Sequence, residues 1–273
     1  MRAYNVQPDA LMLSFKSVVL TFTPDPARGI AVVSADPPLA GVRVDASVPL
    51  SGGPCEDWRD ALRADLADSS QMRLSGNYSS AYGERNWAVA YVDPTSFNAR
   101  ALLGMWHEMG GRVSGVVRDG TAPSTAPSFE STSPSLTKVV RDIDKFSNNV
   151  MAQQLFLTLG LTQRGSGSAE ASRDVLRQWA AESFSAAADR MVIDNGSGLS
   201  RETRVSARLL TRLLLRAWAG PVMPELMSSL SVSGVDGTLK DSGVTPGRAH
   251  LKTGTLRDVS GMAGVGFPSS CHF

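Results

Sequence analysis

The sequence is poor in cysteine and histidine, with two cysteines and three histidines among 273 residues. Two cysteines are too few for a disulfide framework or a cysteine zinc site, and nothing in the spacing of Cys55 and Cys271 favours a bridge between them. His107, His250 and His272 give little material for a metal cluster or a histidine-based catalytic triad. We therefore expect no metal site.

An excess of charge of one sign is also missing, as is any long apolar run. The 27 Lys and Arg nearly cancel the 26 Asp and Glu, so the charge predicts neither a nucleic-acid partner nor an anionic membrane surface. No run approaches the roughly 18 apolar residues that span a bilayer. The first residues lack the apolar segment and small-residue cleavage site of a signal peptide. As written, the chain is expected to stay in the cytoplasm and to act on a small molecule or a peptide.

Alternating patterns dominate the first part of the chain. In "LMLSF" and "VVLTF" large apolar residues alternate with smaller or polar ones, and "GIAVVSA" and "GVRVDASV" follow between turn-forming stretches. This period of two is typical of half-buried strands. We predict that residues 1–90 form a β-rich module without a cluster of catalytic residues.

Helical spacing begins beyond residue 91. Apolar residues from Phe97 to Met109 recur at helical intervals, and a short strand, "RVSGVV", is predicted after them. Residues 120–134 are rich in Ser, Thr and Pro and predict an exposed loop. Ser147 is expected to cap a later helix that Gly160 closes. Further helices are predicted in "SLTKVVRDIDKF", "NNVMAQQLFLTLG", "SRDVLRQWAAESF" and "SARLLTRLLLRAW", and strands in "RAHLKTGTL" and "VSGMAGVG".

Two short triplets hold residues suited to nucleophilic catalysis by serine. A serine that attacks amides needs a base and a site for the developing oxyanion, and one solution combines Ser-x-x-Lys, Ser-x-Asn and Lys-Thr-Gly. Ser147-Asn148-Asn149 opens a predicted helix, and Lys252-Thr253-Gly254 lies on a predicted strand. Either triplet alone is weak evidence, because Ser147 also suits a helix cap and Lys252 a solvated strand position.

Four longer stretches, "DKFSNNVMAQQLFLTLG", "IDNGSGLSRETRVSARLL", "SVSGVDGTLK" and "RAHLKTGTLRDVSGMAG", resemble in this order the D-alanyl-D-alanine carboxypeptidases of the penicillin-binding protein 4 type, peptidase family S13. The opening residues resemble the β-rich region that these enzymes insert between their first two catalytic motifs. The resemblance implies an α/β fold of the DD-peptidase and β-lactamase type, an antiparallel sheet flanked by helices. Residues 1–90 would be a partial insertion module, and residues 91–273 the C-terminal part of the transpeptidase-like domain.

The same resemblance implies a serine-type D-Ala-D-Ala carboxypeptidase or endopeptidase that acts on peptidoglycan stem peptides through an acyl-enzyme. It implies inhibition by β-lactam antibiotics, a periplasmic location for an intact family member, and no metal or organic cofactor. Ser147 would bond to the general-base lysine, and Asn149 would hold the substrate backbone. The backbone N–H of Thr255 would be half of the oxyanion hole. The residues that would hold the peptide ending in D-Ala-D-Ala are Lys252, Thr253, Gly254 and Thr255.

The nucleophile motif is where the sequence departs from the family pattern. Its one Ser-x-x-Lys, Ser135 to Lys138, follows the loop and stands shortly before Ser147, whereas the family's nucleophile precedes the inserted region. Ser135 also occupies a helix N-cap position. We therefore expect that the chain begins after the true motif, is truncated at both ends and is inactive. Two alternatives remain: a non-catalytic module that binds D-Ala-D-Ala peptides or penicillins, and a hydrolase rebuilt on Ser135 and Lys138.

Overall fold

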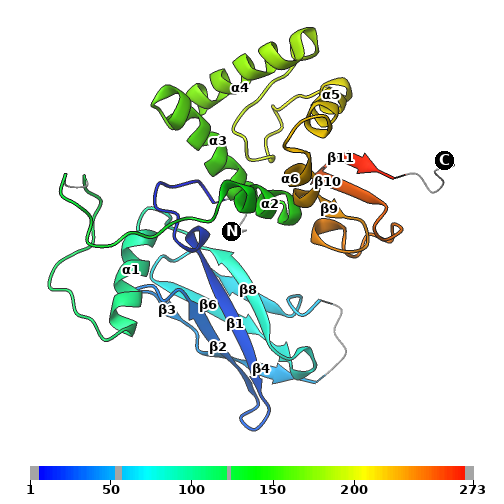
Figure 1. Ribbon diagram of the computed structural model, residues 1–273. Helices are drawn as coiled ribbons and strands as arrows, with labels where there is room; N and C mark the ends of the chain where they lie inside the picture. The colour runs from blue at the N-terminus through cyan, green and yellow to red at the C-terminus, as the bar shows by residue number, and fades with distance from the viewer. Residues whose placement is uncertain (1–5, 53–56, 122–123, 268–273) are drawn as a thin grey trace. The chain divides into compact units, whose positions relative to one another are not determined.

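A computed structural model describes residues 6–52, 57–121 and 124–267 (Figure 1). The chain forms two compact units, Met1–Ala126 and Pro127–Phe273. Cys55 and Cys271 both lie outside the described residues, so the structure does not test whether they pair. No helix of the described part is long and apolar enough to cross a membrane.

The described residues of the first unit form two small sheets. The larger has the strand order β7-β4-β2-β1-β8, and the smaller has the order β3-β6-β5. Strand β2 matches the predicted "GIAVVSA", whereas "GVRVDASV" divides between β3 and β4. The strands are β1 (Ser17–Asp25), β2 (Ile30–Asp36), β3 (Arg43–Val44), β4 (Ser47–Ser51), β5 (Leu62–Asp65), β6 (Gln71–Gly76), β7 (Tyr78–Ser79) and β8 (Arg85–Ala90).

The predicted strand "LMLSF" is wrong. Its last two residues belong to a 3-10 turn, η2 (Ser14–Lys16), in which Phe15 has a positive φ of 51°. The turn carries Lys16 into the unit, where its ammonium donates to the Pro94 carbonyl at 2.9 Å and pairs with Asp9. These bonds hold a bend where the alternating pattern alone predicted a strand.

The core of the first unit explains why the helix α1 (Phe97–Glu108) belongs to it. Phe22 of β1 is fully buried and stacks on Tyr78, with ring centroids 5.5 Å apart. Phe97 and Ala101 of α1 are buried in the same cluster. The sequence pattern changed at residue 91, but the contacts divide the chain only after Ala126. The predicted strand "RVSGVV" does not form, since most of its side chains are exposed and it has no strand partner among the described residues.

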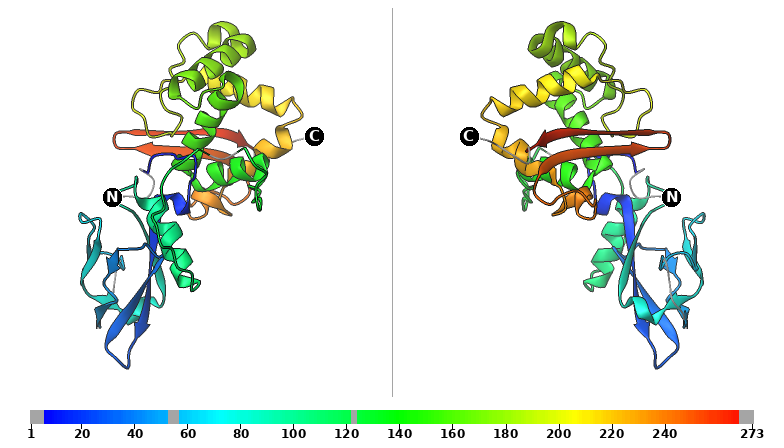
Figure 2. Two further views of the ribbon diagram at one scale, coloured as in Figure 1. Left: turned by 90° about the vertical axis from the view of Figure 1, so that its left-hand side faces the viewer. Right: turned by 90° about the vertical axis from the view of Figure 1, so that its right-hand side faces the viewer.

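The described residues of the second unit form five α-helices and a three-stranded antiparallel sheet of order β11-β10-β9. The predicted helices and both long strands are confirmed; the short α6 and β9 were not predicted. Figure 2 shows β10 and β11 as a long hairpin. The elements are α2 (Leu136–Phe146), α3 (Asn149–Arg164), α4 (Ala169–Phe184), α5 (Ala207–Trp218), α6 (Met223–Ser229), β9 (Ser231–Val232), β10 (Ala249–Leu256) and β11 (Val259–Gly266).

Both predicted ends of α3 need correction. Its N-cap is Asn148, whose side chain accepts from the Met151 N–H at 3.0 Å, and Ser147 instead ends α2. Gly160 lies inside the helix, which ends at Arg164 with Gly165 as its C-cap. A Cβ at Gly160 would come within 2.5 Å of Ser172 Oγ and 2.9 Å of Ser172 N on α4. Glycine stands there because two helices approach closely, and the helix does not end there.

Candidate functional site

Ser147 stands at the sharp turn between α2 and α3. Its backbone is left-handed, with φ 53° and ψ 48°, and its N–H bonds to the Ile143 carbonyl at the end of α2. A non-glycine residue in this conformation costs roughly 1–2 kcal/mol, which the surrounding structure must offset. The turn presents the Ser147 hydroxyl to the strand β10.

Lys252 of β10 meets this hydroxyl. Its Nζ donates to Ser147 Oγ at 2.8 Å and to the Thr253 carbonyl at 2.7 Å. Burial lowers the pKa of Lys252 below its ordinary value of 10.5, and the negative charge of Asp144 partly opposes this shift. The site therefore holds a half-buried cationic donor fixed by two hydrogen bonds.

Asp144 is a site residue that the sequence did not reveal. It lies on α2 one turn before Ser147, and its Oδ2 accepts a 2.8 Å hydrogen bond from Ser229. Burial raises the pKa of this carboxyl, while the Ser229 hydroxyl and the charge of Lys252 lower it in part. Asp144 and Lys252 thus form a partly buried pair of opposite charges, in which each favours the charged form of the other.

Asn149 is oriented by the loop that follows α4. Its Nδ2 donates to the Ser197 carbonyl at 2.8 Å. The Ser197 hydroxyl is engaged within its own loop, since it donates to Asn195 Oδ1 at 2.8 Å and accepts from the Leu199 N–H at 3.1 Å. The loop is held against α3 at Gly196, where an added Cβ would come within 2.5 Å of Phe156. Ser197 therefore supports Asn149 and is not presented as a nucleophile.

The remaining residues of the Lys-Thr-Gly-Thr stretch on β10 are Thr253, Gly254 and Thr255. Thr253 Oγ1 lies 3.1 Å from Thr238 Oγ1. Gly254 and Thr255 are exposed and pair with Gly261 and Ser260 of β11. A Cβ added at Gly254 would come within 4 Å of one non-adjacent described atom, the Gly261 carbonyl oxygen at 3.9 Å. A ligand can therefore approach this backbone closely.

An ion pair between a buried lysine and a partly exposed aspartate joins α2 to the turn that carries Thr238. Lys145 Nζ lies 2.6 Å from Asp236 Oδ2, and the Lys145 side chain is only 7% exposed. Burial raises the pKa of the Asp236 carboxyl, but the bonds from Lys145 and the Val232 N–H outweigh it, so the pKa falls below the ordinary value. In the sequence, the stretch "SVSGVDGTLK" contributed to the family resemblance, but the sequence assigned no role to its individual residues.

Ser135 and Lys138, the alternative nucleophile and base, have other partners. Ser135 is the N-cap of α2, and its Oγ accepts from the Lys138 N–H at 3.4 Å. Lys138 Nζ is paired one turn further on with Asp142, at 2.9 Å from Oδ2. The expected capping role is confirmed, and the lysine amine is held by a carboxylate.

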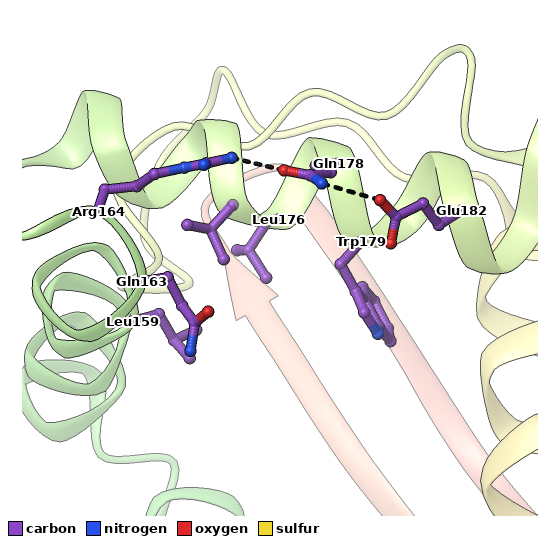
Figure 3. A pocket seen from close by; sticks show the side chains of 8 residues that line it. Leu159, Gln163, Arg164, Leu176, Gln178, Trp179 and Glu182 are labelled. Carbon is purple, nitrogen blue, oxygen red and sulfur yellow. Dashed lines mark hydrogen bonds between the residues drawn. The ribbon is translucent and has the colours of Figure 1, made fainter.

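A cavity of about 520 Å³ lies elsewhere in the second unit, along α3 and α4 (Figure 3). Leu159, Leu176 and Trp179 contribute apolar surface to it. Arg164 donates to Gln178 at 2.5 Å, and Gln178 donates to Glu182 at 2.9 Å. No predicted site residue lines this cavity, so the candidate site is the surface around Lys252. Within the described residues no three His, Cys, Asp or Glu side chains gather to hold a metal ion.

Comparison with known proteins identifies relatives of the chain. It is 31% identical over 141 residues to a D-alanyl-D-alanine carboxypeptidase of Actinomadura sp. (strain R39), a match that covers 49% of this chain and 26% of that enzyme. Its fold is similar to that of penicillin binding protein 4 from Haemophilus influenzae complexed with a β-lactam. That match has a TM-score of 0.65 and 19% identity, and covers 96% of this chain and 61% of the other.

A second crystal structure of the Haemophilus influenzae protein gives a TM-score of 0.62 at 18% identity. The chain thus spans less than two thirds of these relatives. The structural likeness confirms the predicted α/β fold of the DD-peptidase type. A family model described as D-Ala-D-Ala carboxypeptidase 3 (S13) matches residues 1–270. The chain therefore belongs to the D-Ala-D-Ala carboxypeptidase 3 (S13) family.

Proposed function

We propose that this chain supplies the substrate-holding part of a serine-type D-Ala-D-Ala carboxypeptidase that acts on peptidoglycan stem peptides through an acyl-enzyme. The observation that carries the proposal is the 2.8 Å bond between Lys252 and Ser147, which joins the Lys-Thr-Gly and Ser-x-Asn triplets in one site. Membership of the S13 family supports it. The substrate places the action of such an enzyme at the cell wall, in the periplasm, with β-lactams as inhibitors.

The carboxylate of a terminal D-Ala is proposed to bind beside Lys252 and Thr253. A half-buried ammonium makes a stronger hydrogen bond to a carboxylate than a solvated one does, because fewer waters compete for it. Lys252 Nζ already donates two bonds and has three protons, so one proton remains for the ligand. The Thr253 hydroxyl supplies a neutral donor on the same strand.

The peptide backbone is proposed to lie along the free edge of β10. In the described structure β9 pairs only with His250 and Leu251, so residues 252–256 pair with β11 on one side and keep the other edge open. An extended peptide can add to such an edge through backbone hydrogen bonds. Asn149 would fix its register: its Nδ2 is committed to Ser197, and Oδ1 is the group that can accept a substrate N–H.

We further propose that this chain contains no acylated serine. Its one Ser-x-x-Lys uses Ser135 as a helix cap and holds Lys138 against Asp142. The chain would then bind a D-Ala-D-Ala peptide without releasing D-Ala, which is also what the alternative of a non-catalytic binding module predicts. Incubation with a fluorescent penicillin followed by denaturing gel electrophoresis tests this point. A labelled band that disappears in Ser135→Ala would contradict it and identify Ser135 as the nucleophile.

The binding proposal is tested with two synthetic probes, diacetyl-L-Lys-D-Ala-D-Ala and the same peptide with a C-terminal amide. We expect the purified chain to bind the acid more tightly than the amide in calorimetric or NMR titrations. Lys252→Met should weaken binding of the acid about tenfold or more, since a hydrogen bond to a charged group contributes roughly 1.5–3 kcal/mol. Lys138→Met is the matched control, because that lysine lies on the exposed side of α2. Equal binding of acid and amide would refute the assignment.

A further inference from the structure

The hydroxyl of Thr238 lies next to the Lys-Thr-Gly strand although it belongs to a separate turn. That turn, η5 (Gly237–Leu239), follows Asp236, whose carboxylate is paired with Lys145. Gly237 has a φ of 57°, and an added Cβ there would come within 2.6 Å of the Lys145 carbonyl oxygen and 2.3 Å of Ser231 Oγ. The turn is thus pressed against the end of α2 and cannot move inward.

A chain of hydroxyl groups runs from α2 to β10 through this turn. The fully buried Ser231 donates its proton to the Lys145 carbonyl at 3.3 Å, because a carbonyl can only accept. Ser231 Oγ in turn accepts from the Thr238 N–H at 3.2 Å. Thr238 Oγ1 lies 3.4 Å from Ser231 Oγ but only 3.1 Å from Thr253 Oγ1.

Either threonine hydroxyl could donate in the last contact, and the distances favour one direction. Ser231 Oγ already accepts from the Thr238 backbone, and its 3.4 Å contact with the Thr238 hydroxyl is longer than the usual O–H···O range of about 2.5–3.0 Å. The shorter contact makes Thr253 Oγ1 the better acceptor for the Thr238 proton. Thr253 then accepts from Thr238, and its own proton is left for a ligand. A hydroxyl that accepts one bond also donates a stronger one.

We propose that Thr238 is a positioning residue for carboxylate recognition: its hydroxyl donates to Thr253 and directs the Thr253 proton toward the bound peptide carboxylate. The inference rests on the proposed function, because it deepens the role of the same strand. The "DGTL" turn would then contribute to substrate selection through the Thr238 hydroxyl, which need not contact the substrate itself. The ion pair between Lys145 and Asp236 helps to fix the turn, and therefore the distance between the two threonines.

The test compares Thr238→Val, which keeps the shape and removes the hydroxyl, with Thr238→Ser, which keeps the hydroxyl. We expect Thr238→Val to weaken binding of diacetyl-L-Lys-D-Ala-D-Ala about fivefold, the effect of losing one neutral hydrogen bond, and to leave the amide peptide unaffected. Thr238→Ser should restore most of the affinity for the acid. Thr245→Val, a change at an exposed threonine outside the site, is the matched control.

The outcomes separate this inference from the function on which it rests. One outcome is that the wild-type chain prefers the acid, that Lys252→Met abolishes this preference, and that Thr238→Val leaves it unchanged. That outcome refutes the role of Thr238, while the proposed function stands. Failure of Thr238→Ser to restore affinity also refutes it, because a loss due to packing alone would be shared by both variants. A wild-type chain that binds acid and amide equally refutes both. Thr238 is exposed, so the variants should fold; Thr238→Ala gives a second hydroxyl-free variant, and circular dichroism checks each one.

Discussion

Lys252 Nζ lies 2.8 Å from Ser147 Oγ, although 105 positions separate the two residues in the chain. The contact joins a strand of a hairpin to the left-handed residue between two helices. It brings a cation, two hydroxyls and an amide to one surface, a combination suited to a peptide carboxylate and its neighbouring backbone groups.

Binding of the acid peptide should be lost at a lower alkaline pH than an ordinary lysine would give. Burial lowers the pKa of Lys252 below 10.5, so the amine loses its proton and its charge before a solvated lysine does. Below that pKa the ammonium is present and binding is intact; as pH rises through it, affinity for the acid should fall. Calorimetry across the alkaline range checks this. An affinity that persists beyond pH 10.5 would show that Lys252 does not bind the carboxylate.

Asp144→Asn should lower the pKa of Lys252 further. The carboxylate favours the ammonium form, and its amide isostere keeps a hydrogen-bond acceptor for Ser229 without the charge. The alkaline limit of acid-peptide binding should therefore move to lower pH in the variant. A ¹³C NMR titration of the Lys252 side chain measures the pKa directly. Asp142→Asn, which changes the partner of Lys138, is the control and should leave Lys252 unchanged.

Gly160→Ala should destabilise the second unit. Alanine in a helix interior is favoured over glycine by about 1 kcal/mol, but the new methyl group would press on Ser172 and on the Ser166 carbonyl. Overpacking of this kind typically costs about 1–3 kcal/mol, so the net change should be a loss of stability. Urea denaturation followed by circular dichroism measures it. Gly167→Ala, where an added Cβ makes only contacts of 3.7 Å or longer, should be nearly neutral.

Ser135→Ala should reduce the free energy of unfolding by about 1 kcal/mol, the usual contribution of a helix N-cap. It should leave binding of the acid peptide unchanged, because Ser135 acts on the first turn of α2. Thermal denaturation and a peptide titration on the same sample separate the two effects. Ser206→Ala, which removes the equivalent cap of α5, should show a similar loss. A large fall in peptide affinity in Ser135→Ala, but not in Ser206→Ala, would show that Ser135 belongs to the binding site.

The sequence determined those features that depend on near neighbours in the chain. The apolar spacing of α2, α4 and α5 and the capping serines Ser135 and Ser206 act within one or two turns, so their pattern predicts the helices directly. The strands β10 and β11 pair across a two-residue turn, which is also local. The family and the two site triplets were likewise readable, since each triplet is continuous in the chain.

Only the tertiary structure decided which groups meet across the fold. Asp144 looked like any polar residue of an amphipathic helix, and its coupling to Lys252 exists because the fold brings the end of α2 to Lys252. Gly160 looked like a helix end, until the close approach of α4 showed why a side chain has no room there. Ser147 looked like a cap, but the turn between two helices gave that task to Asn148 and left the Ser147 hydroxyl for Lys252. Such contacts depend on packing between distant segments, and the local spacing of residues in the sequence does not predict that packing.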